Sequence, residues 1–576
     1  MRPTFRLRIA RSAAGLDVRS PDETDNLGLE TVARSPMAEL CVGKAASTSP
    51  LDPLGRTIVG RAIGRDGQPA RLMGGKVGAQ FSEQVVREFW GMFLAVEIPP
   101  DGDPVRVTRD ASSLLPAYYA ATGSELIVAS DVSLLTAERS VKSIDWTAVA
   151  THLHCDSLRT RRTCIAGVSE LLAGEVLVAG HGQFSVKPVW SPWAFTHRDA
   201  QINDYRSAVD QLRDCVLSTV AALANGYEHA VIGISGGLDS SVVAAALLNS
   251  GVKISALTLA TTAPGGDERH YARILSSGLG FGLTEAVEEV DCVDIAHSEA
   301  AGLPRPVARS FAQWGNRRHA ELATDVAADV FFNGAGGDNV FCALNSVSML
   351  ADRWMTEGLR IGLLHTARDL AVMGDTTWWD ALKRGLARAR RKPLHYRWPL
   401  TGKFLSEYSR THVAFEHPWL AARPDGTLPG KSAHVAWMMG IQNHLEGFSH
   451  GRIHPIVSPL VAQPVQELCL RIPTWFWCAG GRNRAVARDA FADLLPQAIV
   501  NRTSKGTPST FVLALMRANS ASIKEMLNYG ILAEHGFVDT GAVNACLDCP
   551  DDPVPATYAR MMALVDVEAW LQSWRG

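Results

Sequence analysis

The sequence predicts an α/β protein with two domains, and three observations carry this prediction. At 576 residues the chain is longer than a single hydrophobic core usually organises. Residues 1–190 are rich in short β-type runs, whereas from residue 230 onward strand-like runs alternate with helical ones. Such alternation is typical of a parallel sheet with helices on both faces. We therefore expect one domain over residues 1–190 and a second over residues 200–576.

The first domain begins with a predicted strand. Residues 1–10 alternate polar and apolar side chains, which indicates a strand and not the continuous apolar core of a signal peptide. Further short runs between Asp, Gly and Pro turns are predicted as strands at 105–108, 125–129, 175–179 and 183–186. Residues 188–200 contain proline and tryptophan without periodicity, so we interpret them as the linker.

The second domain opens with a predicted helix over 204–224, because its apolar residues recur on one helical face. The predicted strands that follow lie at 231–234, 253–259 and 326–332. The predicted helices between them lie at 241–248, at 269–279 and around Ala320. After residue 345 the pattern is mostly helical.

Composition excludes several classes of function. A net charge of -3 offers no electrostatic basis for a nucleic-acid partner, and no apolar stretch is long enough to span a membrane. Sparse, scattered cysteines favour a reducing cytoplasm, and the close pair Cys546 and Cys549 has no partners at zinc-site spacing. The basic run at 383–397 is interpreted as a solvated surface, with contact to an acidic peptide as the weaker alternative.

The strongest local signal is the loop at 235–241, Ser-Gly-Gly-Leu-Asp-Ser-Ser, between a predicted strand and helix. Gly236 and Gly237 allow a ligand to approach the backbone, and the N–H groups at the helix start form an anion site. Asp239 in a phosphate-binding loop indicates a bridging Mg²⁺. Hydroxyl donors are supplied by Ser235, Ser240 and Ser241. The loop resembles the pyrophosphate-binding loop of ATP pyrophosphatases.

A second glycine-rich segment, residues 331–341, places Asp338 after another apolar run. Loops at the carboxyl ends of parallel strands converge on one crevice. Asp239 and Asp338 are therefore expected to share a magnesium ion that holds the phosphates of ATP.

Cations gather in residues 480–506. Arg484 and Arg488 are four residues apart and share a helix face, while Lys505 lies in a polar loop that ends in glycine. Such cations can neutralise pyrophosphate, or an oxyanion formed when an amine attacks an acyl-adenylate.

Together these segments resemble the asparagine synthetase superfamily. The matching pieces are 235–241, 258–272, 334–338 and 484–506, with 90–93, 109–110, 118–119 and 161–175 in the first domain. The resemblance implies an N-terminal glutaminase-like (Ntn-type) sandwich and a C-terminal ATP-pyrophosphatase domain. It implies ATP and Mg²⁺, a catalytic Lys505, and metal binding by Asp239 and Asp338. The residues it assigns to ATP and pyrophosphate are Ser235, Gly236, Gly237, Asp239, Ser240, Ser241, Leu257, Gly336 and Arg484.

Two departures from the superfamily pattern bear on the reaction. A glutaminase of this type uses an N-terminal cysteine after Met1 is removed, and here residue 2 is Arg2. The amine is therefore expected to come from the substrate itself. Asparagine synthetases carry Glu, and β-lactam synthetases Tyr, three positions before the second metal aspartate, where this chain has Ala335.

Residues 458–475 resemble a segment of lasso-peptide macrolactam synthetases. That resemblance implies a cytoplasmic ligase that adenylates an Asp or Glu side chain of a ribosomal precursor peptide, which the peptide's N-terminal amine then attacks. It also implies a leader peptidase or leader-binding protein as a candidate partner. The alternatives are a small-molecule asparagine or β-lactam synthetase, and a non-catalytic ATP-dependent binding protein.

Overall fold

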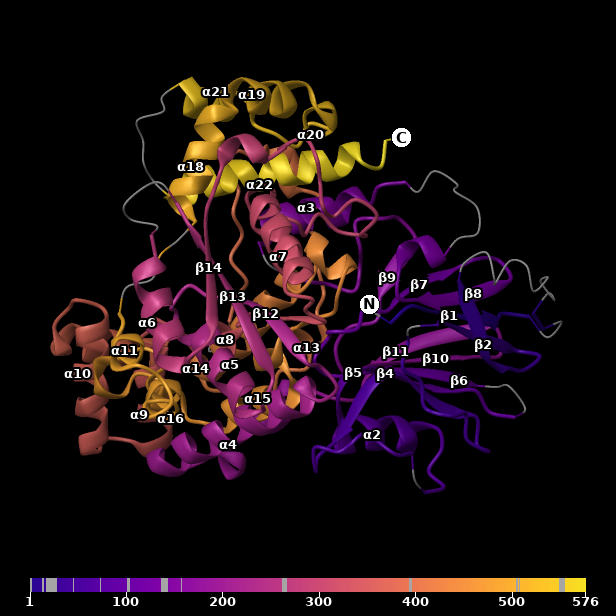
Figure 1. Ribbon diagram of the computed structural model, residues 1–576, viewed down its shortest axis with the longest axis horizontal. Coiled ribbons are helices and arrows are strands. Elements are labelled where there is room, and N and C mark those ends of the chain that lie inside the picture. The colour runs from indigo at the N-terminus through magenta and orange to yellow at the C-terminus, as the bar shows by residue number, and fades with distance from the viewer. Residues whose placement is uncertain are drawn as a thin grey trace.

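The computed structural model describes residues 3–12, 15–16, 28–44, 46–72, 74–100, 104–135, 143–156, 158–261, 267–392, 396–503, 506, 508–548 and 555–575. Figure 1 shows a β-rich N-terminal domain beside a larger α/β part that contains the remainder of the chain. The mixed α/β class expected from the sequence is thus observed, with a sheet-rich N-terminal domain and a second domain that contains a parallel sheet.

The N-terminal domain is a sandwich of two antiparallel sheets. Their strands are β1 (Phe5–Ala10), β2 (Leu29–Arg34), β3 (Ala38–Gly43), β4 (Arg56–Gly64), β5 (Phe89–Glu97), β6 (Val105–Arg109), β7 (Tyr118–Ala121), β8 (Glu125–Ala129), β9 (Val168–Glu170), β10 (Glu175–Gly180) and β11 (Gln183–Pro188). The strand orders are β2-β3-β1-β8-β7-β9 and β11-β10-β6-β5-β4. Apolar side chains from both sheets, such as Leu7 of β1 and Val107 of β6, meet in one buried core. The helix α2 (Ala79–Glu88) packs against β5, and α3 (Trp146–His154) follows β8 in the chain.

The second domain is built on a five-stranded sheet in the order β14-β13-β12-β15-β16. All its pairings are parallel, with Ile232 opposite Ala256 on one side and Phe332 on the other. The strands are β12 (His229–Gly233), β13 (Lys253–Ala260), β14 (Gly282–Val287), β15 (Val330–Phe332) and β16 (Ile456–Val457). Because neighbouring strands run the same way, their carboxyl ends lie along one edge.

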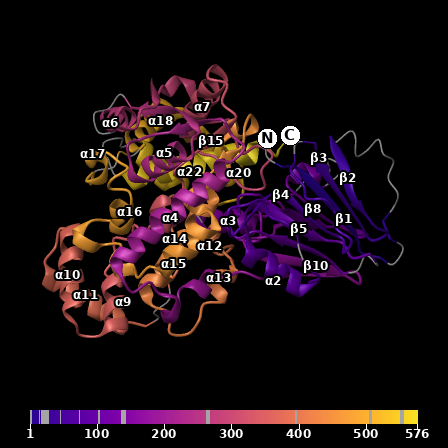
Figure 2. The same cartoon turned by 60° about the horizontal axis from the view of Figure 1, so that its bottom comes forward.

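Helices surround this sheet. Those that precede β16 are α4 (Tyr205–Ala224), α5 (Leu238–Asn249), α6 (Arg269–Leu279), α7 (Gln313–Asp325), α8 (Gly337–Val340), α9 (Ser348–Glu357), α10 (Ile361–Met373), α11 (Trp378–Arg390), α12 (Glu407–Arg410), α13 (Pro418–Ala421) and α14 (Pro429–Ile441). Those that follow are α15 (Gln463–Arg471), α16 (Ala485–Ala490), α17 (Gln497–Val500), α18 (Ser509–Ala518), α19 (Ser520–Tyr529), α20 (Ile531–Glu534), α21 (Thr540–Asp548) and α22 (Pro555–Gln572). In both ribbon views α9, α10 and α11 form a lobe on the side away from the N-terminal domain (Figures 1 and 2).

Most elements expected from the sequence are present, with one clear correction. The strand predicted over 326–332 is confined to β15 (Val330–Phe332). Val326 instead caps the end of α7, and Ala327 has a φ of 51°, a turn conformation that a strand does not accommodate. The linker expected at 188–200 contains two short 3₁₀ turns, at Pro192–Phe195 and Arg198–Ala200.

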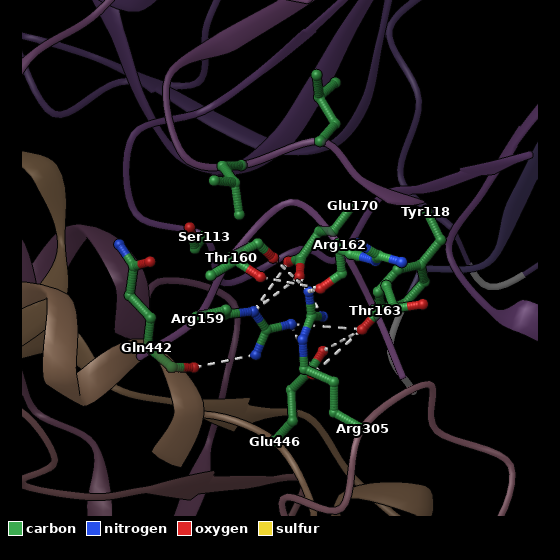
Figure 3. A network of polar contacts seen from close by, with 12 residues as sticks. Ser113, Tyr118, Arg159, Thr160, Arg162, Thr163, Glu170, Arg305, Gln442 and Glu446 are labelled. Atoms are coloured by element: carbon green, nitrogen blue, oxygen red, sulfur yellow. Dashed lines mark hydrogen bonds and ion pairs between the residues drawn. The ribbon is translucent and has the colours of Figure 1, made fainter. Parts of the chain in front are cut away.

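A buried network of charges joins the two domains (Figure 3). Glu170 of β9 accepts hydrogen bonds from Arg109 at 2.7 Å, from Arg159 at 2.9 Å and, across the domain boundary, from Arg305 at 2.6 Å. Arg159 also reaches Glu446 of the second domain at 2.8 Å. Burial alone would raise the pKa of the Glu170 carboxyl, but the three guanidinium groups lower it well below its usual range.

Candidate functional site

A cavity of about 590 Å³ lies at the carboxyl edge of the parallel sheet. Gly233, at the end of β12, and Leu257 and Leu259 of β13 form one wall, and the start of α5 forms the floor. This is the position at which ligands bind in open parallel sheets. The cavity is large enough for a nucleotide-sized ligand.

The two glycine-rich loops expected to converge are in direct contact. A Cβ atom at Gly334 would lie 2.5 Å from the backbone nitrogen of Ser240, and one at Gly337 would lie 2.2 Å from the carboxyl carbon of Asp239. Glycine is therefore required at both positions for the second loop to lie against the first. This packing brings Asp239 and Asp338 to the same cavity.

The carboxylates of Asp239 and Asp338 converge on one cationic nitrogen. Arg484 Nη1 lies 2.9 and 3.1 Å from the two oxygens of Asp239 and 2.6 Å from Asp338 Oδ1. Arg484 lies just before α16 with a φ of 54°, and only 9% of its side chain is exposed. The guanidinium thus occupies the point at which a shared divalent cation would bind, and the two oxygen donors fit Mg²⁺ with phosphate and water as further ligands. The described residues contain no cluster of three or more His, Cys, Asp or Glu side chains suited to a metal, so this pair is the candidate.

The N-terminus of α5 faces this cavity. In the described part of the chain no side chain caps this helix at Gly237, so the N–H groups of its first turn remain available to phosphate oxygens. Ser235, Gly237 and Ser240 line the cavity with Asp239, as expected.

Three residues that the resemblance assigns to ATP are not among the described residues that line this cavity. Ser241 is fully buried and its hydroxyl donates to the Gly237 carbonyl at 2.8 Å. Gly236 is packed against Tyr271, and Gly336 against Val461. These three residues shape the loops, whereas the cavity lining comes from their neighbours.

Arg502, Thr503, Gly506 and Pro508 also line the cavity. Arg502 donates to the Ser235 carbonyl at 2.7 Å, pairs with Glu268, and lies 4.0 Å over the Tyr271 ring. Gly506 N donates to the same Glu268 at 2.9 Å. Lys505, the expected catalytic residue, lies outside the described residues. Its described neighbours Thr503 and Gly506 line the cavity.

Glu288 and Trp437 line the cavity without having been predicted from the sequence, whereas the cation Arg488 was predicted and lines it too. Burial raises the pKa of the Glu288 carboxyl, just after β14, to about 7. Arg488 donates to the Val500 carbonyl at 2.5 Å, and burial lowers its pKa to about 10. Trp437 of α14 is 43% exposed, and its indole N–H donates to the Asp338 carbonyl at 3.2 Å. Only the alternation of strands and helices could have pointed to Glu288, because it follows a strand that ends at this edge.

The N-terminal domain offers no reactive thiol among its described residues. Cys41, Cys155 and Cys164 are all buried, and burial raises the pKa of each, to about 12 for the last two. A thiol with a raised pKa is protonated near neutral pH and is a poor nucleophile. Residue 2, where the superfamily's cysteine would be, lies outside the described residues.

Comparison with known proteins identifies the two halves. The asparagine synthase family matches residues 211–574, and the glutamine amidotransferase domain matches residues 76–190. No curated protein shows significant similarity to the chain. None of the described helices is both long and apolar enough to cross a bilayer.

Similar solved structures include NMN synthetase from Francisella tularensis, at 13% identity and a TM-score of 0.18. That match covers 25% of this chain and 60% of the NMN synthetase. A glutamine phosphoribosylpyrophosphate amidotransferase from B. subtilis has 10% identity and a TM-score of 0.19, covering 57% of this chain and 84% of that one. The allosteric regulatory enzyme of purine biosynthesis has 10% identity and a TM-score of 0.17, covering 45% and 68%. Since residues 211–574 are more than half of the 576-residue sequence, the chain belongs to the asparagine synthase family of ATP-dependent amide-bond-forming ligases.

Proposed function

We propose that the chain closes an amide bond within a ribosomal precursor peptide. In this reaction ATP adenylates an Asp or Glu side chain, and the peptide's own N-terminal amine then forms the macrolactam. The observation that carries the ATP-dependent step is the convergence of Asp239 and Asp338 on one cation beside the start of α5.

In the first step a carboxylate oxygen of the peptide attacks the α-phosphorus of ATP, and pyrophosphate leaves. The α5 N-terminus and the hydroxyl of Ser240 bind phosphate oxygens, and Asp239 and Asp338 would hold Mg²⁺. A bound Mg²⁺ neutralises charge that develops on the departing pyrophosphate.

In the second step the peptide amine attacks the acyl-adenylate carbonyl, and AMP leaves as the amide forms. The amine loses one proton, and the site must orient two ends of one molecule. Orientation of this kind contributes roughly 7–11 kcal/mol to ring closure. Lys505 is proposed to stabilise the oxyanion of this step.

Two features favour a substrate that supplies its own amine. The described thiols of the N-terminal domain are buried and protonated, so they cannot hydrolyse glutamine. Ala335 also leaves no carboxylate or phenol at the position where asparagine and β-lactam synthetases carry one. The N-terminal domain then has a structural or peptide-holding role.

The segment 458–475, which resembles the macrolactam synthetases, docks the N-terminal domain in this structure. Gln463 Nε2 donates to the Val86 carbonyl at 2.7 Å, and Glu467 accepts from Arg65 at 2.8 Å and Trp190 at 3.0 Å. This docking is consistent with a domain that helps to hold a large substrate.

The test is incubation of the full chain with ATP, Mg²⁺ and one of four substrates. These are a synthetic leader–core peptide with an Asp or Glu in its core, aspartate with ammonia, aspartate with glutamine, and a small β-amino acid. We expect AMP to form only in the reaction that contains the peptide, and we expect that peptide to lose one water. AMP with aspartate and ammonia, or with the β-amino acid, would assign a small-molecule synthetase. ATP binding without AMP in all four reactions would assign a binding protein.

A further inference from the structure

A second cavity, of about 380 Å³, lies beneath the linker between the domains. Its wall combines aromatic side chains with two guanidinium groups, from Trp193, Tyr396, Trp398, Phe415, Arg397 and Arg423. The rings of Tyr396 and Trp398 contact edge to face at 5.9 Å. Tyr396 N donates to Ser432 Oγ of α14 at 2.8 Å, which fixes this segment against the helix. Trp, Tyr and Arg are the side chains that dominate recognition surfaces.

The charge of this cavity is uncompensated. No Asp or Glu is found among the described residues that line it. Arg423 has one hydrogen bond, to the Pro424 carbonyl at 3.3 Å, and the exposed Arg397 has no hydrogen bond or ion pair within the described part of the chain. Two guanidinium groups beside aromatic rings, without a carboxylate, are complementary to an anionic group attached to an apolar one.

The chain that leads to this cavity is rich in positive charge. Residues 383–397 contain seven Lys or Arg residues and no Asp or Glu. Most of this run belongs to α11, and α9 packs against both α11 and α14. The run leads directly to Arg397 in the cavity wall. A carboxylate in the cavity would therefore meet the guanidinium groups of Arg397 and Arg423.

One helix separates this cavity from the nucleotide cavity. On α14, Ser432, Val435 and Ala436 line the second cavity, whereas the adjacent Trp437 lines the first and donates to the Asp338 carbonyl. A helix is about 10 Å thick, and an extended peptide advances about 3.3 Å per residue. A peptide that reaches both cavities must pass around this helix, so it needs more than roughly three residues between the two anchored groups.

We propose that the second cavity binds an aromatic side chain of the peptide substrate together with a neighbouring carboxylate. It holds the peptide while a different carboxylate is adenylated beside Asp239 and Asp338. This inference rests on the proposed peptide substrate, and it adds a recognition site outside the reacting centre. The aromatic group packs among the tryptophans, and the carboxylate accepts hydrogen bonds from Arg423 and Arg397.

The test uses two probes, N-acetyl-Phe-Asp-amide and its uncharged counterpart N-acetyl-Phe-Asn-amide. Their affinities for the full chain are measured by saturation-transfer NMR. We expect the aspartyl probe to bind roughly tenfold more tightly, as one charge-assisted hydrogen bond would give. Arg423→Gln removes this preference, and Trp398→Leu weakens both probes. Arg575→Gln is the control, because it makes the same charge change on a half-exposed side chain near the C-terminus. It is expected to change neither the preference nor the affinity for either probe.

Two further measurements separate this site from the ligase reaction. Asp338→Asn is expected to abolish AMP formation and leave probe binding unchanged, and saturating ATP is expected not to displace the probes. Equal affinities for the two probes, or an undiminished preference in a folded Arg423→Gln protein, would overturn the proposal. Displacement by ATP would place the probes in the nucleotide cavity and overturn it as well.

Discussion

Arg484 Nη1 lies 2.6 Å from Asp338 Oδ1, and the same nitrogen is within 3.1 Å of both carboxylate oxygens of Asp239. A single guanidinium thus joins two loops that are about a hundred residues apart in sequence. It also competes for the oxygens that a divalent cation needs. Arg484 must therefore move, or share these oxygens, when a metal–nucleotide complex binds.

The first prediction follows from this competition. Arg484→Met is expected to bind Mn²⁺ more tightly than the parent chain in the absence of nucleotide, measured by electron paramagnetic resonance. The same variant loses cationic stabilisation of pyrophosphate, so AMP formation falls by roughly a hundred- to a thousand-fold. Arg482→Met is the matched control, because Arg482 pairs with Asp489 instead. Unchanged Mn²⁺ affinity in Arg484→Met would contradict the shared site.

The second prediction concerns the two carboxylates themselves. Asp239→Asn and Asp338→Asn should each fold and yet fail to release AMP, because pyrophosphate leaves as a concentrated negative charge that the metal must neutralise. Exchange of labelled pyrophosphate into ATP measures this step directly. Asp325→Asn changes an exposed carboxylate at the end of α7 and is expected to leave the exchange unchanged. Near-normal exchange in Asp239→Asn would exclude the magnesium role.

The third prediction is a pH dependence of ATP binding. Burial raises the pKa of Glu288 to about 7, so this cavity carboxyl is neutral below that pH and anionic above it. An anion beside a polyphosphate is repulsive, so the dissociation constant for ATP should increase as the pH rises through 7. The increase is expected to reach up to about tenfold, which corresponds to about 1.4 kcal/mol.

Isothermal titration calorimetry between pH 6 and pH 8 measures this effect. Glu288→Gln should bind ATP with a flatter pH profile and more tightly at pH 8. Glu289→Gln alters the next residue, which is exposed, and should retain the parent profile. A steep profile in Glu288→Gln would assign the titration to another group.

The fourth prediction tests the buried charges between the domains. Glu446→Gln removes one of the two carboxylate partners of the Arg159 guanidinium, of which 3% is exposed, and leaves Glu170 as the other. Because Glu170 still compensates the guanidinium, the expected cost is that of one buried charge-assisted hydrogen bond, about 1.5–3 kcal/mol in the free energy of unfolding. Glu534→Gln breaks a half-exposed pair with Arg575 and should cost less than about 1 kcal/mol. Urea unfolding monitored by tryptophan fluorescence compares the two variants. Equal losses in the free energy of unfolding would exclude the network as the main interaction that stabilises the contact between the domains.

Acid should weaken the same network. The folded-state pKa of Glu170 is lowered, so its stabilising contribution is complete above the ordinary glutamate pKa of about 4.3 and is lost as the pH falls below it. The parent chain should therefore lose stability steeply below that pH. Glu170→Gln, which has no group to titrate, should be less stable at neutral pH and lose less on acidification.

Local patterns predicted the elements that carry the site. The helix at Arg269–Leu279 and the strand at Glu125–Ala129 match the sequence-based ranges, because each has an unbroken period and clear turn residues at its ends. The strand predicted from residue 326 was too long, since apolar composition does not reveal the turn at Ala327. The two residues of β16 carry no periodicity and form a strand only by pairing with β15.

The site could be predicted as a set of loops, but its long-range contacts could not. Glycine spacing and the position of Asp239 and Asp338 after apolar runs indicated the phosphate site. Sequence alone assigned Arg484 to phosphate and could not indicate that it bridges both aspartates. Likewise, Arg159 and Glu446 are far apart in the chain, and an ion pair of that kind leaves no periodic signal.

The last prediction concerns Lys505, whose role is a proposal from the family resemblance. An acyl-adenylate attacked by an amine passes through a tetrahedral state with negative charge on the former carbonyl oxygen. A fixed ammonium directed at that oxygen stabilises the transition state more than the ground state. Loss of one such donor typically costs roughly a hundred- to a thousand-fold in rate.

Lys505→Ala should therefore fold and bind ATP but fail to release cyclised peptide. Lys505→Arg should fail too, because the guanidinium is larger and directs its donors differently. Mass spectrometry of the core peptide for the loss of one water, beside an ATP-binding assay, measures both. Lys524→Ala is the control, since that lysine is half-exposed on α19 and pairs with Asp548 at 3.0 Å. If Lys505→Ala cyclises the peptide at the parent rate, Lys505 is only a surface charge, and the oxyanion must be stabilised by other donors of the cavity.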